Sequence, residues 1–81
     1  MKKLKLVELT WRDIVEEAGW IDDEDHEDIH ILKTYGLLVY KGKETVTIAN
    51  TYDPELKKWG GRNKFPRGCI SNIRLITTIT V

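Results

Sequence analysis

The sequence predicts a mainly β protein, folded as a small curved barrel of the SH3-like or Sm-like type. Short runs of alternating or β-branched residues recur along the 81 residues, and turn residues separate them at intervals of about eight to twelve positions. We expect five or six short antiparallel strands and one short helix. The chain has room for a single domain, 1–81, because so short a chain buries only about 60–65% of its unfolded surface. An OB-type barrel is the runner-up, but it usually needs a longer chain.

Residues 3–12 are predicted to form the first strand, because apolar and polar residues alternate in KLKLVELTWR. The apolar positions change phase after Leu6. They divide into two sets on opposite faces, Leu4 and Leu6 in one and Val7, Leu9 and Trp11 in the other. This phase slip predicts either a β-bulge or a strand that is covered on both faces.

A short helix and an acidic loop are expected next. Asp13 and Glu16 resemble a capping box, which predicts a helix of one or two turns in DIVEEA, with Gly19 as its stop. Residues 22–28, DDEDHED, hold six acids in seven positions. Since packed like charges repel, this run is predicted to be an exposed loop.

The middle of the chain predicts a hairpin. Residues 29–40, IHILKTYGLLVY, are rich in β-branched, aromatic and aliphatic side chains. Gly36 interrupts this strand, and a glycine in mid-strand marks a bulge or a sharp bend. KGKE then provides a tight turn, and residues 45–51, TVTIANT, alternate as the second strand.

The last third of the chain reads as a loop, a turn and a final strand. Breakers such as Asp53-Pro54 and Gly60-Gly61 predict a loop over residues 52–64 that opens into a short strand near 61–65. FPRGCI is expected to be a tight turn. Residues 70–80 are predicted to be a strand with five core candidates, Ile70, Ile73, Leu75, Ile76 and Ile79.

Composition predicts a cytoplasmic protein. Cys69 is the only cysteine, so no intramolecular disulfide can form, whereas a secreted domain of this size usually needs several. The first residues lack the long apolar core of a signal peptide. No run approaches the roughly 18 apolar residues of a membrane span. We therefore expect no membrane partner.

The charge is unevenly distributed, although the chain is neutral as a whole. Residues 1–28 contain four bases and ten acids, a net charge of −6, and residues 29–81 contain nine bases and three acids, a net charge of +6. Such asymmetry can indicate an oriented partner. The other interpretation is that oppositely charged loops attract each other within the fold or across an oligomer.

The pentapeptide HEDIH, residues 26–30, matches the zinc-protease pattern H-E-x-x-H. On a helix, His26 and His30 would share a face and bind one zinc ion, with Glu27 as general base. The following residues predict a strand instead, in which residues four apart lie about 13 Å from each other. The chain also has no third histidine. We therefore expect no metal site, no cofactor and no catalytic residue, and a zinc hydrolase is only a remote alternative.

Basic and aromatic residues are interleaved in KKWGGRNKFPR, residues 57–67. Cations follow phosphates and aromatic rings stack on bases, so this segment is a candidate platform for single-stranded nucleic acid. The candidate binding residues are Lys57, Lys58, Trp59, Arg62, Lys64, Phe65 and Arg67. The other interpretation is that the aromatic residues pack on the barrel or on a neighbouring subunit. The near-neutral isoelectric point opposes strong nucleic-acid binding.

The order of several motifs resembles a group of small phage- and prophage-encoded proteins of uncharacterised function. The motifs here are VELTWRD, GW, an acidic loop, TYGLLVY, VTIANT and FPRGCISNIRLI. The matching positions are Trp11, Asp13, Gly19, Trp20, Gly36, Pro66, Gly68, Cys69, Ile70 and Ile73. This chain departs from the pattern at Phe65, where an aliphatic residue is common, and in its long acidic loop. The resemblance implies a phage-like origin and no particular chemistry.

Together these observations predict a non-enzymatic binding or assembly module. A barrel with free edges and a modest core gains stability from pairing, so we expect a protein partner or self-association. Binding of single-stranded nucleic acid through residues 57–67 is the alternative.

Overall fold

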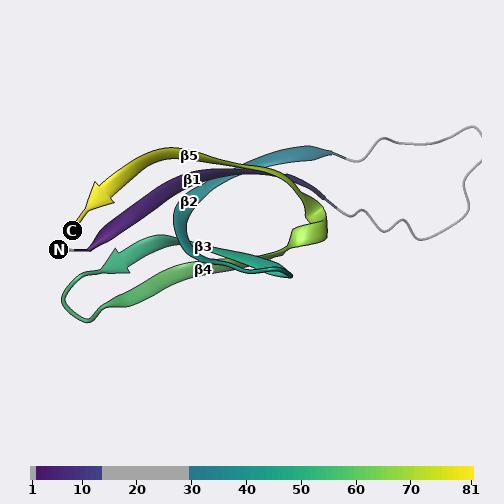
Figure 1. Ribbon diagram of the computed structural model, residues 1–81. Coiled ribbons are helices and arrows are strands. Elements are labelled where there is room, and N and C mark those ends of the chain that lie inside the picture. Colours follow the sequence, from purple (N-terminus) through teal and green to yellow (C-terminus); the bar gives the residue numbers. More distant parts are fainter. Residues whose placement is uncertain (1, 14–29) are drawn as a thin grey trace, which may run out of the picture.

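The computed structural model describes residues 2–13 and 30–81, which form one antiparallel sheet (Figure 1). The strand order is β4-β3-β2-β1-β5. The elements are β1 (Lys3–Arg12), β2 (Ile31–Lys41), β3 (Thr45–Asp53), β4 (Lys58–Pro66), the 3-10 helix η1 (Arg67–Cys69) and β5 (Ile70–Thr80). The sheet curls, so that β1, β2 and β5 lie over β3 and β4, and η1 turns the chain from one layer to the other.

The predicted mainly β class with antiparallel strands is confirmed. Within the described ranges, hydrogen bonds do not close the sheet into a barrel, because β4 pairs with β3 alone and β5 pairs with β1 alone. The predicted helix in DIVEEA and the predicted loop at 22–28 lie outside the described residues, apart from Asp13. No helix in residues 2–13 or 30–81 has the length and apolar character needed to cross a membrane.

The phase slip predicted either a bulge in the first strand or cover on both faces, and the second is found. The β1–β5 register shifts between Leu6, which pairs with Thr77, and Val7, which pairs with Leu75, so the extra residue is Ile76 on β5. The strand β1 is also covered on both faces, since the adjacent residues Glu8 and Leu9 are only 5% and 0% exposed. The predicted cover on both faces is therefore present in β1, whereas the bulge lies on its neighbour β5.

Gly36 permits a close approach between strands. The β2–β3 register shift lies between Leu38 and Tyr40, so the bulge is at Val39 and not at the glycine. A Cβ atom on Gly36 would lie 3.0 Å from the Ala49 carbonyl oxygen and 3.1 Å from Cδ1 of Ile48. The glycine therefore lets the buried Ile48 side chain cover this part of β2.

Adding one methyl group at this point is expected to destabilise the fold. Gly36→Ala crowds the Ile48 side chain and the Ala49 carbonyl, and such overpacking typically costs about 1–3 kcal/mol. Gly68→Ala is the matched control, because a Cβ there meets nothing within 4 Å. Urea unfolding followed by tryptophan fluorescence should show a lower midpoint for the first variant only. Equal midpoints for the two variants would contradict the close approach.

The core lies between the two layers of the curled sheet. Its centre is formed by four buried residues, Val7 and Leu9 of β1 and Val46 and Ile48 of β3. Residues packed against this centre are Trp11, Leu38, Phe65, Ile70 and Ile73. Trp11 contacts the Phe65 ring edge-on at 5.2 Å between centroids, and its indole N–H donates a 2.8 Å hydrogen bond to Thr34.

Two sequence-based expectations about the last strands were wrong. Of the five core candidates in β5, only Ile70 and Ile73 pack against the core, whereas Leu75, Ile76 and Ile79 are 53%, 40% and 38% exposed. The reason is that β5 is an edge strand with one neighbour, a fact that apolar patterning does not reveal.

The predicted loop at 52–64 was also wrong, because most of these residues belong to β3 and β4. The strand β4 begins at Lys58, and β3 continues to Asp53, because Tyr52 pairs with Trp59 and Thr51 pairs with Gly60. The cross-strand partners extend the hairpin through the glycines, and Gly61 takes a positive φ of 60° within the strand.

Candidate nucleic-acid interface

The β2–β3 turn and the start of η1 are joined by backbone hydrogen bonds. Gly42 N–H donates to the Thr45 carbonyl over 2.9 Å, which closes the turn. Arg67 N–H donates to the Glu44 carbonyl over 2.7 Å, which ties η1 to the turn. Residues that are far apart in the sequence are thereby held beside each other.

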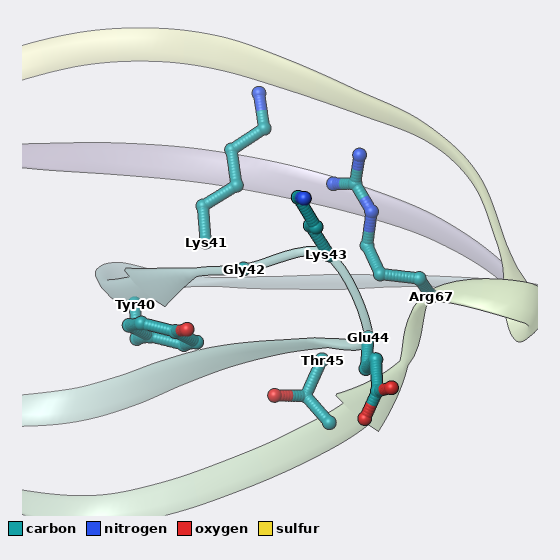
Figure 2. Close-up of a pocket in the computed structure, with 7 residues that line it drawn as sticks. All are labelled: Tyr40, Lys41, Gly42, Lys43, Glu44, Thr45 and Arg67. Atoms are coloured by element: carbon teal, nitrogen blue, oxygen red, sulfur yellow. The ribbon is translucent and has the colours of Figure 1, made fainter.

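Three cationic side chains lie on one side of this junction. Figure 2 shows Lys41, Lys43 and Arg67 extending the same way from the backbone, while Glu44 points to the opposite side. A shallow pocket is lined by these residues together with Tyr40 and Thr45. A second pocket also contains Lys41 and Arg67 and adds the polar side chains of Ser71 and Asn72.

Two further cations lie near this turn, on β4. A third pocket shares Tyr40 and Thr45 with the first and adds Arg62 and Lys64. The register places Tyr40, Thr47 and Lys64 on one face of the sheet and Lys41 on the other, so the cations lie on both faces around the β2–β3 turn. We call this surface the basic band. Its members are Tyr40, Lys41, Lys43, Arg62, Lys64 and Arg67.

An exposed aromatic ring lies within the basic band. Tyr40 is 57% exposed. A Cβ atom on Gly42 would meet the Tyr40 ring at 2.5 Å, so the absence of a side chain at Gly42 allows the ring to lie against the turn. The tyrosine ring thus lies against the turn while much of its surface stays open to a ligand.

The charges of the basic band are not neutralised by neighbours in the described part of the chain. All five cations are exposed, and the ion pairs found there involve only Glu8 with Lys33 and Arg74. Residues 2–13 and 30–81 contain thirteen bases and five acids, a net charge of +8, although the whole chain is neutral. The sheet itself is therefore strongly basic.

The two predicted binding aromatics already have partners within the protein. Phe65 packs against the core and contacts Trp11. The half-buried Trp59 lies 4.6 Å from the Tyr52 ring, and the Lys2 ammonium lies 5.5 Å from the Trp59 ring centroid. Because side chains alternate along a strand, Phe65 and the cationic Lys64 point to opposite faces of β4.

The predicted cations divide into two groups. Arg62, Lys64 and Arg67 belong to the basic band, whereas Lys57 and Lys58 lie at the far end of the β3–β4 hairpin, where Lys58 is opposite Asp53. Sequence reasoning missed Tyr40, Lys41 and Lys43. The lysines of KGKE were visible as a turn, but their proximity to Arg67 arises only from the fold.

A second polar cluster surrounds the buried Glu8 on β1. Arg74 donates hydrogen bonds to the Glu8 carboxylate over 3.1 and 3.3 Å, and Lys33 lies 3.4 Å from it. Hydrogen bonding by Arg74, and next by the Tyr35 hydroxyl, lowers the pKa of Glu8 from 4.5 to about 2. The cluster links β2, β1 and β5 and has the character of a structural ion pair.

The other residues considered for chemistry are the HEDIH motif and Cys69, and neither forms a site within the described residues. Of HEDIH, only His30 lies in the described residues; it is exposed, directly precedes β2, and accepts a backbone hydrogen bond from Asp13. Residues 26–29 lie outside the described residues. No group of three or more histidine, cysteine, aspartate or glutamate residues within 2–13 and 30–81 could hold a metal ion. Cys69 is half-buried at the end of η1.

Comparison with family models, with curated proteins and with solved structures finds no match for this chain.

Proposed function

We propose that this protein is a non-enzymatic module that binds single-stranded nucleic acid through the basic band. The single observation that carries the proposal is the gathering of five exposed cations around the β2–β3 turn, without ion-pair partners among the described residues, with Arg62 and Lys64 in one pocket with the exposed ring of Tyr40. Lys and Arg side chains bind phosphates, and an aromatic ring among them stacks on a base. This combination is typical of surfaces that follow a single strand.

The position of the basic band suits an extended ligand. Its pockets run from Ser71 and Asn72 at the start of β5, past the β2–β3 turn, to Arg62 and Lys64 on β4. The pockets are open and shallow, so they suit a chain of phosphates better than an enclosed small molecule. Ser and Asn side chains add hydrogen-bond donors for phosphate or base edges.

Three further proposals, on barrel type, origin and location, accompany this one. We infer that the curled sheet is a barrel of the SH3-like type, open between β4 and β5, which is supported by the return of β5 to pair with β1. A phage-like origin is a proposal that rests on the ordered motifs from VELTWRD to FPRGCISNIRLI, and a cytoplasmic location is a proposal that rests on the single cysteine, Cys69.

The test is the salt dependence of oligonucleotide binding, measured by fluorescence anisotropy with a labelled single strand. Each neutralised phosphate contributes about −0.7 to the slope of log K against log salt for single strands. Removing two contacts with Lys41→Ala/Arg67→Ala should therefore make the slope shallower by about 1.4. Tyr40→Ala should weaken binding at every salt concentration, because a stacked base is worth about 1–3 kcal/mol.

The matched control is Lys57→Ala/Lys58→Ala, which removes the same charge from the far end of the hairpin. It should leave the slope unchanged if the basic band binds the strand. Equal effects of the two double variants would reduce the interaction to general charge attraction and overturn the proposal. Absence of binding at low salt, or no effect of Tyr40→Ala, would also overturn it.

A further inference from the structure

The two edges of the sheet differ in how well they are protected against pairing. The β4 edge carries Lys58, Arg62, Lys64 and Pro66, and Gly61 interrupts it with a positive φ. Charged residues, proline and local irregularity are the usual means by which an edge strand avoids other strands. The β4 edge is therefore protected.

The β5 edge has little of this protection in its C-terminal half, where the bulge at Ile76 is the one irregularity and the residues after it pair regularly with β1. This strand has eleven residues without lysine, proline or glycine, and its only charge, Arg74, is bound to Glu8. Four apolar residues near its end are exposed, Leu75, Ile76, Ile79 and Val81. Among the described residues, β5 pairs with β1 alone, so its other edge is unpaired. A long apolar edge of this kind is a template for another strand.

The hydrogen bonding at the end of the chain identifies the groups on the free edge. Lys2 and Val81 exchange both backbone hydrogen bonds, at 2.9 and 3.3 Å. In an antiparallel ladder such pairs alternate with pairs whose N–H and C=O groups point away. The register from Lys3–Thr80 to Leu6–Thr77 is regular. Thr78 and Thr80 therefore direct their backbone N–H and C=O groups to the free edge.

We propose that β5 pairs with β5 of a second copy of this chain, in an antiparallel, two-fold symmetric contact. A register centred on Thr78 places Leu75 opposite the partner's Val81 and Thr77 opposite the partner's Ile79. All four exposed apolar residues then gain cross-strand neighbours. The two sheets would continue as one sheet across the dimer.

A second copy suits this edge for two reasons that the structure provides. A two-fold contact places the same surface on both sides, and this register pairs only residues 75–81, which include no charged residue, so no like charges meet. The protein also has only six buried apolar residues in its described core, against nine large apolar residues that are exposed. Pairing of β5 gives four of those nine exposed side chains a cross-strand neighbour. The inference does not depend on nucleic-acid binding.

The experiment is sedimentation of the full chain over a range of concentrations. Wild-type protein is expected to reach twice the chain mass of 9.4 kDa. Thr78→Pro removes one free-edge donor without touching the β1 ladder, and proline is tolerated on such an edge. Thr78→Lys places a charge beside its copy in the contact. Both variants are expected to be monomeric, with circular dichroism showing the wild-type strand content.

The control is Asn63→Lys on the β4 edge, which should leave the dimer intact. A wild-type chain that stays monomeric at its highest soluble concentration would overturn the proposal. Dimers that persist in Thr78→Lys, or that dissociate in Asn63→Lys, would also overturn it, since association would then use another surface. Thr78→Lys keeps the test decisive if the proline variant does not fold.

Discussion

Leu9→Ala is expected to remove a large part of the folding free energy. Leu9 is 0% exposed and lies in the core with Val7, Val46 and Ile48. Truncating a buried leucine leaves a cavity and typically costs about 2–5 kcal/mol. A domain of this size is stabilised by only about 4–12 kcal/mol. The urea midpoint should therefore fall steeply, and part of the population should be unfolded at elevated temperature.

Leu56→Ala is the matched control for this prediction, because the same side chain is 64% exposed in the β3–β4 turn. Surface substitutions of this kind usually stay within about 0.5 kcal/mol of wild type. Similar losses in the two variants would mean that β1 does not form the centre of the core.

Glu8→Gln is expected to be the most damaging substitution of a polar residue. The variant keeps the size of the side chain but removes the charge that binds Arg74 and Lys33 across two strand pairs. A carboxylate accepts stronger hydrogen bonds than a neutral amide, so their loss at the buried Glu8 destabilises the fold, although Arg74 and Lys33 are 56% exposed and stay solvated. Glu55→Gln, in the exposed β3–β4 turn, is the control and should unfold at the wild-type midpoint.

The contribution of Glu8 to the stability of the fold should decrease as the pH falls. The pKa of Glu8 falls to about 2 in the folded protein from an ordinary value of 4.5, because Arg74 and Tyr35 hydrogen-bond its carboxylate. Protons then bind preferentially to the unfolded chain, so this stabilisation is complete above about pH 4.5 and is lost as the pH falls towards 2. The stability difference between wild type and Glu8→Gln should shrink over the same window. A stability difference that is constant from neutral pH to pH 2 would contradict the lowered pKa of Glu8.

Much of the fold followed from local pattern. The bounds of β1 and β5 and the β2–β3 turn were all predicted. These features depend on alternation and turn residues, which act over a few positions. The prediction for β4 was less accurate, because the pairing of Trp59 with Tyr52 overrides the breaking tendency of Gly60-Gly61.

The candidate site was predicted only in part. Arg62, Lys64 and Arg67 were named from the sequence and lie in the basic band. Tyr40, Lys41 and Lys43 were not, since they follow a different strand and reach Arg67 only through the hydrogen bond between η1 and the β2–β3 turn. The binding role of Trp59 and Phe65 stays a prediction, and both rings have partners within the protein.

The sequence by itself determined that this protein is a small β-rich domain with an uneven charge distribution, because strand periodicity, turn residues and charge are all local properties. Only the tertiary structure decided which strands became edges, which faces became buried and which cations lie together. The physical reason is that burial and electrostatic contact depend on neighbours across the sheet. Those neighbours are set by register: one extra residue at Ile76 or Val39 changes what every following side chain meets.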